Sequence, residues 1–278
     1  MSHNILTKET VKLLAIETAT SWQSVAVTDG ERVLALVEQD AEGSHARCLM
    51  PAIDNALKSA GIGLRDLTGL AVSIGPGSFT GLRVGLATML GFRSVLGIPL
   101  VLVPTLEAMA WQHKHCLGTV VPVLKSRKNE VYWALYDWLP DGTLKARATE
   151  QVGPPEMLGR ALKSVAPASL FGDGWVAYRD QIRDALGPEA TSLKEEDFNR
   201  PSAASVAEAA QSRFDRQEIA GALIAPLYVQ RPEAEIKYDE HQGISALERR
   251  RNRIAQKLDR TAQVRQGRKK ANGRAKRQ

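Results

Sequence analysis

The chain opens with three short runs rich in apolar residues, a pattern typical of β-strands. The runs cover residues 11–17, 22–29 and 32–38. The Asp29-Gly30 pair between the second and third runs is a strong hairpin signal. The opening segment therefore predicts three strands, and the last two are expected to pair in antiparallel fashion.

Helical spacing of the apolar residues begins after Ser44. Leu49, Ile53 and Leu57 recur every four residues and would share one helix face. Because Ser44 is a good N-cap and Gly61 a good stop, we expect a helix over residues 44–60. The pattern then predicts a strand at 70–74, a helix at 80–96, a strand at 100–103 and a helix at 105–113. This order is typical of an α/β domain with a mixed sheet.

The same order begins again after about residue 116. Strands are expected at 119–124, 130–138, 143–148 and 170–174, and helices at 178–186 and 202–214. The repetition predicts two related lobes, at 11–113 and 114–235, between a flexible N-terminus at 1–10 and a basic tail at 236–278. Sequence alone does not decide on which lobe the last helix packs.

The turn before the helix at 80–96 is rich in glycine. Gly75 and Gly77 stand beside Ser78 and Thr80, either of which could cap the helix. Such a junction directs backbone N–H groups and the positive end of a helix dipole at one point, which suits an anion. The turn lacks the Gly-Lys-Ser/Thr of a P-loop and misses the dinucleotide fingerprint by one residue. These four residues therefore predict either an anion or nucleotide site or a tight turn without a ligand.

The same helix carries three interior glycines, Gly81, Gly85 and Gly91. Each costs roughly 0.5–1 kcal/mol relative to alanine, so a close backbone contact is expected to offset the loss. Gly81 and Gly85 share a face. The contact could be with this chain or with a second one, and the sequence favours this chain.

Positive charge is concentrated at the C-terminal end. Residues 246–278 hold thirteen Lys and Arg against two acidic residues, a balance of +11, so residues 1–245 carry −5 of the chain's total of +6. The segment has few apolar residues and no aromatic ones, which is typical of a chain that does not fold alone. A polycation binds phosphate backbones without reading sequence, whereas the plainer interpretation is a solubilising tail. The candidate contacts are Arg249, Arg250, Arg251, Arg268, Lys269 and Lys270.

Composition narrows the class of protein. No stretch approaches the ~18 apolar residues of a membrane span. The first ten residues lack the apolar core of a secretory signal. The two cysteines, Cys48 and Cys116, are expected to be reduced. Together these features predict a cytoplasmic protein without membrane contact.

Seven segments, taken together, resemble the TsaB (YeaZ) family over about residues 11–235. They are Leu14-Ala15-Ile16-Glu17-Thr18-Ala19-Thr20, His45, residues 74–85, Ile98-Pro99-Leu100-Val101, Glu130-Val131-Tyr132, Gly172-Asp173-Gly174 and Pro226-Leu227-Tyr228-Val229-Gln230-Arg231. The resemblance implies the two-lobed α/β fold of actin, hexokinase and Hsp70-type ATPases. It also implies a role beside TsaD and TsaE in making threonylcarbamoyladenosine at position 37 of tRNAs.

The resemblance further implies a heterodimer with TsaD through the helices at 44–60 and 80–96. The same surface could form a homodimer when the chain is alone. The residues expected there are His45, Leu49, Ile53, Gly81, Arg83, Gly85, Thr88 and Phe92.

The residues of a catalyst are not evident. The catalytic relative holds a metal partly through two histidines four apart on a helix, and no pair of this chain's five histidines has that spacing. His113, His115 and Cys116 could ligate a metal only from an unwound segment. The turn after the first strand has Glu17 but no glycine to let backbone approach a triphosphate. Glu17, Glu130 and Asp173 could still converge near a cleft.

We therefore expect a scaffold subunit without catalytic residues, metal or cofactor of its own. ATP or ADP at the junction with the partner is left open. The alternatives are a metal-dependent peptidase-like enzyme, an ATP-dependent enzyme of the same fold, and a tRNA-binding accessory that acts through the tail.

One segment departs from the family pattern. Where the resemblance leads us to expect Asp-Ala-Arg-x-Gly-Glu-Val-Tyr, the chain has Lys125-Ser126-Arg127-Lys128-Asn129-Glu130-Val131-Tyr132. Lys125 reverses the charge of an acidic position, and Asn129 replaces a glycine while also tolerating positive φ. This change favours a surface that performs no chemistry.

Overall fold

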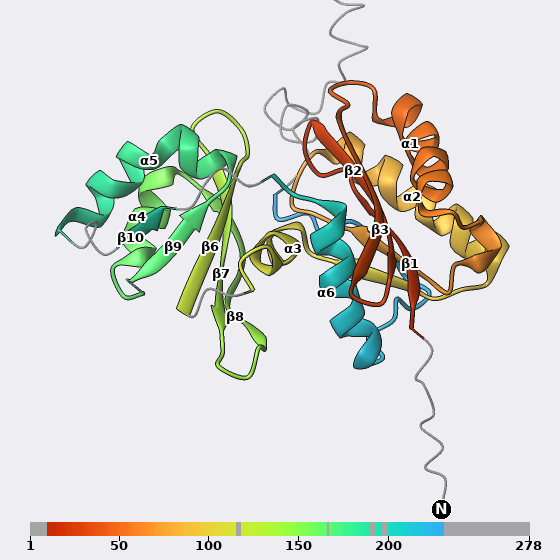
Figure 1. Ribbon diagram of the computed structural model, residues 1–278. Coiled ribbons are helices and arrows are strands. Elements are labelled where there is room, and N and C mark those ends of the chain that lie inside the picture. The colour runs from red at the N-terminus through yellow and green to blue at the C-terminus, as the bar shows by residue number, and fades with distance from the viewer. Residues whose placement is uncertain (1–9, 115–117, 166, 189–192, 196–199, 231–278) are drawn as a thin grey trace, which may run out of the picture. The chain divides into compact units, whose positions relative to one another are not determined.

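The computed structural model describes residues 10–114, 118–165, 167–188, 193–195 and 200–230 (Figure 1). Most of the predicted N-terminus and all of the predicted tail lie outside these ranges. The residues up to Val229 belong to one compact unit that contains two sheets. In the described part of the chain, no helix is long and apolar enough to cross a membrane.

The first sheet has five strands in the order β3-β2-β1-β4-β5. The first three strands are antiparallel, and β4 and β5 continue the sheet in parallel with β1. The register pairs Ile16 with both Val25 and Val72, which places their side chains on one face. The strands are β1 (Lys12–Glu17), β2 (Trp22–Asp29), β3 (Arg32–Asp40), β4 (Gly69–Ser73) and β5 (Leu100–Val103).

Helices cover both faces of this sheet (Figure 1). Leu14 and Ile16 of β1 pack towards α1 (His45–Ala60) and α2 (Phe79–Leu96), whereas Leu13 and Ala15 pack towards the opposite layer. That layer contains α3 (Thr105–Trp111) and α6 (Ala203–Asp215). Since α6 lies against the first sheet, the question left open by the sequence is answered. The short 3-10 helix η1 (Leu64–Asp66) precedes β4.

The second sheet repeats this plan, with the order β10-β9-β6-β7-β8. Three antiparallel strands are again followed by two parallel ones. Leu158 of α4 and Ile182 of α5 pack with Val121 of β6 in a core of their own. The elements are β6 (Gly118–Lys125), β7 (Val131–Trp138), β8 (Leu144–Gly153), α4 (Pro155–Leu162), β9 (Ala168–Phe171), α5 (Asp173–Leu186) and β10 (Leu193–Glu195).

The predicted elements of the first sheet are confirmed, and those of the second need correction. The helix α5 starts at Asp173 rather than at Tyr178, where a non-helical residue (φ −130°, ψ 17°) interrupts it. Helix α4 was not predicted because its Pro154-Pro155 start resembles a loop, although proline is well suited to the first helical position. Strand β10 was also missed, since only three residues form it.

Candidate functional site

The start of α2 packs closely against the turn between β1 and β2. A Cβ atom on Gly77 would lie 2.3 Å from the Ala19 carbonyl oxygen, and one on Gly81 would lie 2.1 Å from that of Thr18. Ser78 N–H donates to the Ala19 carbonyl at 2.6 Å, and the Thr18 hydroxyl donates to the Gly81 carbonyl at 2.9 Å. The β1–β2 turn and the start of α2 thus pack backbone against backbone at positions where glycine has no side chain.

Gly85 continues this contact one turn further along α2. A Cβ atom there would lie 2.4 Å from Thr18 Oγ1, whereas one on Gly91 would meet nothing within 4 Å. The interpretation that the interior glycines serve a contact within the chain is therefore confirmed for Gly81 and Gly85.

The predicted anion-binding residues fall into two groups. Gly75 and Gly77 pack against the chain's own backbone, because a Cβ on Gly75 would lie 2.7 Å from the Leu227 carbonyl oxygen and one on Gly77 would lie 2.3 Å from that of Ala19. Ser78 and Thr80 are exposed at the start of α2, where Ser78 Oγ accepts from Gly81 N–H at 3.2 Å. The anion site stays a prediction, and it is limited to the exposed helix start.

Glu17 is buried at the end of β1 and does not face a cleft. Its carboxylate accepts a hydrogen bond from Ala19 N–H and so holds the β1–β2 turn. Burial raises its pKa from 4.5 to about 7, and the hydrogen bond from Ala19 N–H opposes this rise. This residue therefore carries a proton through part of the neutral range.

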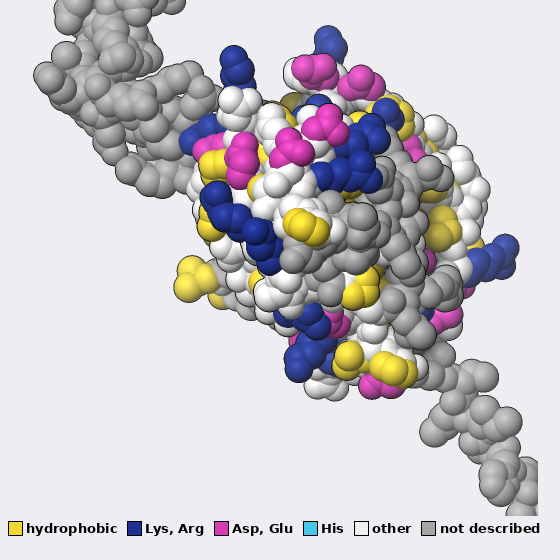
Figure 2. All heavy atoms as spheres, turned by 90° about the vertical axis from the view of Figure 1, so that its left-hand side faces the viewer, with side chains coloured by type: hydrophobic (Ala, Val, Ile, Leu, Met, Phe, Trp, Pro, Cys, Tyr) yellow, Lys and Arg dark blue, Asp and Glu magenta, His cyan; other side chains and the backbone are white. Residues whose placement is uncertain are grey.

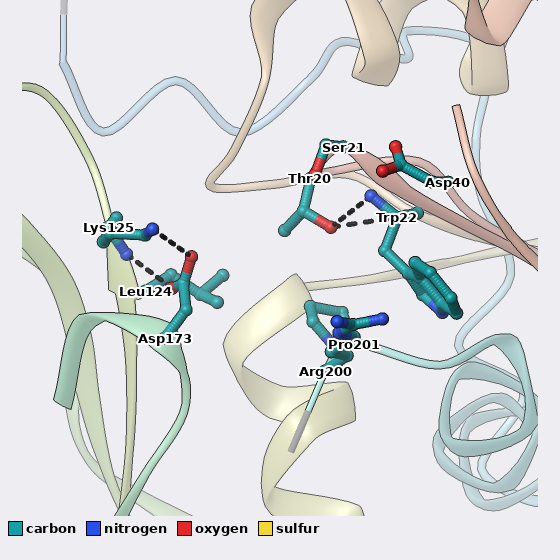
Figure 3. Close-up of a pocket in the computed structure, with 9 residues that line it drawn as sticks. All are labelled: Thr20, Ser21, Trp22, Asp40, Leu124, Lys125, Asp173, Arg200 and Pro201. Atoms are coloured by element: carbon teal, nitrogen blue, oxygen red, sulfur yellow. Dashed lines mark hydrogen bonds and ion pairs between the residues drawn. The ribbon is translucent and has the colours of Figure 1, made fainter. Parts of the chain in front are cut away.

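A polar cavity of about 230 Å³ lies beyond this turn (Figure 3). It brings together the β1–β2 turn, the ends of β3 and β6, the start of α5 and the segment before α6. Its lining residues are Thr20, Ser21, Trp22, Asp40, Leu124, Lys125, Asp173, Arg200 and Pro201.

Lys125 and Asp173 form one wall of this cavity. Lys125 N–H donates to Asp173 Oδ1 at 2.8 Å, and its ammonium lies 3.8 Å from Oδ2 (Figure 3). Burial raises the pKa of Asp173, while the Lys125 N–H and charge oppose the rise. The cation that departs from the family pattern thus pairs with a carboxylate.

The opposite wall includes Trp22, with the Arg200 guanidinium 4.0 Å from the centre of its ring. Neither of these residues, nor Asp40 or Pro201, was singled out from the sequence. They are far apart in sequence and carry no shared motif, so only the fold brings them together. Of the three carboxylates considered for the cleft, Asp173 lines the cavity and Glu17 and Glu130 do not.

A metal centre is not evident in the described part of the chain, where no three His, Cys, Asp or Glu side chains are grouped suitably. His113 is buried and its ring lies 3.9 Å from that of Phe171. His115 and Cys116 lie outside the described residues.

The predicted partner residues divide between core and surface. His45, Leu49, Ile53, Gly81 and Gly85 are buried within the chain. Burial lowers the pKa of His45, and a hydrogen bond that its ring donates to the Thr20 backbone carbonyl and the charge of Asp40 oppose this. Arg83 is exposed, and Thr88 and Phe92 are half-buried.

Other residues form the outer surface of α1 and α2. Met50 is 51% exposed and Val95 is 84% exposed. Ala87 and Gly91 are exposed as well. We call these four residues the outer α1–α2 face. Its four members are small or apolar and are interspersed with exposed polar residues such as Asp54 and Ser94. The sequence missed them because the buried stripe carries the stronger hydrophobic pattern.

Two sheets with the same strand order, each covered by helices, define a protein of the two-lobed actin–hexokinase–Hsp70 class. Residues 36–238 match the family model described as TsaD: tRNA N6-adenosine threonylcarbamoyltransferase. The chain belongs to the TsaB (YeaZ) family within this group, and the resemblance drawn from its motifs is confirmed.

Individual relatives support this assignment. The tRNA threonylcarbamoyladenosine biosynthesis protein TsaB of Escherichia coli is 33% identical over 174 residues, which cover 61% of this chain and 74% of the relative. Its Haemophilus influenzae counterpart is 30% identical over 238 residues, or 80% and 94%. The solved structure of YeaZ from Pseudomonas aeruginosa is 26% identical and covers 78% of this chain and 99% of its own, with a TM-score of 0.66.

Proposed function

We propose that this chain is a non-catalytic subunit of the system that makes threonylcarbamoyladenosine at position 37 of tRNAs reading codons that begin with A. In this proposal it forms a heterodimer with TsaD, and TsaE joins the complex. The observation that carries the proposal is the closed glycine turn. Leu227 and Ala19 pack against Gly75 and Gly77, and the Ala19 carbonyl takes up the Ser78 N–H that an anion at this turn would need.

The cavity supports the same conclusion. Asp173 is held by the backbone N–H and the ammonium of Lys125. A carboxylate paired in this way is less available as a metal ligand, since the cation would first have to be displaced. An ATP or ADP shared with the partner remains compatible with this arrangement, because its phosphates and metal could be held by TsaD.

The outer α1–α2 face is the surface we assign to TsaD. Its exposed Met50 and Val95 offer apolar area, and Ala87 and Gly91 allow a second helix to approach closely. Arg83 is exposed on the same helix, and we include it in the proposed interface. The buried members of the predicted set would act indirectly, by fixing the two helices.

Replacing Val95 with Arg tests the interface. An arginine in the centre of an apolar contact would leave a buried charge without a partner, so we expect TsaD to bind about tenfold more weakly or not at all. The measurement is co-purification followed by titration calorimetry. Val176→Arg is the matched control, since Val176 is an exposed valine on α5 (46% exposed).

Equal binding by the two variants would overturn the assigned face. Loss of self-association together with unchanged TsaD binding would show that the face serves a homodimer instead. Gly85→Leu is unsuitable as a probe, because its side chain would collide with Thr18 inside the chain.

A further inference from the structure

The exposed side of α2 ends in a single cation. Arg83, Ala87, Gly91 and Val95 follow one another at intervals of four residues, so they form one of the rows that run along a helix surface. All four residues are exposed. The outer α1–α2 face therefore continues along the helix as far as Arg83, and a partner that covers Ala87 also approaches this guanidinium.

The Arg83 side chain is held in a fixed orientation. Its guanidinium lies 3.7 Å from the centre of the Phe79 ring, and its Nε donates to the Tyr228 hydroxyl at 2.9 Å. The rings of Phe79 and Tyr228 are themselves stacked, with their centres 5.2 Å apart. A long side chain that is already ordered loses less conformational freedom when it binds a second molecule.

Tyr228 is positioned by the backbone that leads to it. Leu227 N–H donates to the Ile74 carbonyl at 2.7 Å, immediately before the tyrosine. Earlier in the same segment, the Arg93 guanidinium donates to the Ala220 carbonyl at 2.9 Å. The segment that carries the tyrosine is thus attached to α2 and to the end of β4 at separate points, and these contacts fix the hydroxyl that orients Arg83.

The terminal nitrogen atoms of Arg83 remain available for a further contact. Among the residues that the structure describes, the hydrogen-bond partner of this guanidinium is Tyr228, which takes up Nε. The two Nη atoms present N–H groups side by side, a geometry that matches the paired oxygens of a carboxylate or a phosphate. The arginine is exposed, so this pair of donors faces away from the chain's core.

A carboxylate suits this surface better than the phosphates of a nucleic acid. Binding to a phosphate backbone depends on several cations along one surface. Helix α2 has two cations, Arg83 and Arg93, and Arg93 is engaged by the Ala220 carbonyl. The surroundings of Arg83 are two aromatic rings and a row of small or apolar residues. Arginine and tyrosine beside apolar area are typical of the centre of a protein–protein interface.

We infer that Arg83 binds a carboxylate side chain of the TsaD partner through its two Nη atoms, and that Phe79 and Tyr228 hold it ready for this contact. The inference rests on the proposed heterodimer and names the chemical group that the partner presents. That group is an Asp or Glu on the partner element that packs along Ala87 and Gly91. Covering the pair with this element strengthens its hydrogen bonds, because water is excluded from them.

The test measures the affinity of full-length variants for TsaD by titration calorimetry across a series of salt concentrations. Arg83→Gln removes the cation, whereas Arg83→Lys keeps the charge and loses the flat pair of donors. Tyr228→Phe keeps the ring and removes the hydroxyl that orients Nε. Urea unfolding of each variant establishes that it is folded under the conditions of the titration.

Arg160→Gln is the matched control, since Arg160 is an exposed arginine on α4. The side of the molecule on which α4 and α5 lie carries Lys and Arg side chains interspersed with Asp and Glu (Figure 2). This mixed surface differs from the small and apolar row beside Arg83. The control therefore removes the same charge from a surface outside the proposed interface.

We expect Arg83→Gln to bind TsaD at least about tenfold more weakly at low salt, and to lose part of the salt dependence of binding. Arg83→Lys should recover only part of the affinity, because one ammonium cannot form two parallel hydrogen bonds. Tyr228→Phe should weaken binding about threefold and keep the salt dependence. The Arg160→Gln control should match the natural chain at every salt concentration.

Charge reversal separates binding by Arg83 from a merely structural role. Arg83→Glu should weaken binding further than Arg83→Gln, because it places two carboxylates together. Each exposed Asp and Glu of TsaD is then replaced with Arg in turn. We expect one of these replacements to restore about tenfold of the lost affinity for the Arg83→Glu variant. A change in the partner cannot repair a packing defect within this chain.

Several results would overturn the inference. If Arg83→Gln binds TsaD normally while Val95→Arg does not, the heterodimer stands without this contact. If both variants bind normally, the assigned face is wrong as well. Equal weakening by Arg83→Gln and Arg160→Gln, or the absence of any restoring replacement in TsaD, would also contradict the carboxylate pair. Weaker tRNA binding by Arg83→Gln with unchanged TsaD binding would assign the guanidinium to a phosphate instead.

Discussion

Glu17 carries a carboxyl group inside the first sheet, and ionisation of this group lowers the stability of the folded chain. The folded chain holds its proton more tightly than the unfolded chain, because burial raises the pKa from 4.5 to about 7. Stability from this group is therefore complete below about pH 4.5 and declines as the pH rises towards 7. At 1.36 kcal/mol per pKa unit, the ionised group costs up to about 3 kcal/mol.

The Glu17→Gln substitution should remove this loss of stability. Its amide oxygen can still accept from Ala19 N–H, and the amide bears no charge. We expect the variant to gain up to about 3 kcal/mol in free energy of unfolding at pH 8 relative to the natural chain, and to gain little at pH 4.5. Urea titrations at both pH values check this. A gain that is the same at both would contradict the buried, titrating carboxyl.

Lys125 shows what a single residue can reveal from sequence. Its positive charge departs from the pattern that the family resemblance leads us to expect, but its partner could not be predicted. Asp173 is 48 residues away and belongs to the start of a helix. Arg200 and Trp22 are separated by an even longer stretch of sequence than Lys125 and Asp173. Most of the cavity wall was therefore not predictable from any motif.

Helix α2 combines two functions in one element. Its inner face uses missing side chains to admit the β1–β2 turn, and its outer face presents Ala87, Gly91 and Val95. The glycine spacing alone predicted a close approach. The identity of the approaching backbone required the fold.

Alanine substitutions should separate the two faces. Gly81→Ala places a Cβ atom 2.1 Å from the Thr18 carbonyl, so we expect a loss of about 1–3 kcal/mol in free energy of unfolding. Gly91→Ala meets nothing and should gain roughly 0.5–1 kcal/mol from helix propensity. Chemical denaturation of both variants gives the comparison. Similar effects at the two positions would contradict the proposed packing.

The elements of the first sheet were predictable because their periodicity is strong and their turns carry Gly, Asn or Asp signals. The boundaries failed where local patterns conflict with tertiary contacts. Tyr178 is a helix interruption that resembles a helix start, and the proline pair before α4 resembles a loop. The placement of α6 depends on its small Ala203 and Ala207 side chains fitting the first sheet, which no pattern specifies.

For the whole molecule, the described unit combines a closed glycine turn, a cavity with an internally paired carboxylate, and an outer apolar helix face. Together they favour a molecule that keeps the architecture of a nucleotide-dependent enzyme and serves as a subunit of one.

Reconstitution of tRNA modification tests this account most directly. TsaD and TsaE are supplied with tRNA and the small-molecule substrates, and threonylcarbamoyladenosine is measured with this chain, without it, and with this chain alone. The account predicts product only when this chain and TsaD are both present, and no ATP turnover by this chain alone. Product or ATP turnover from this chain alone, or equal product from TsaD and TsaE without it, would contradict the account.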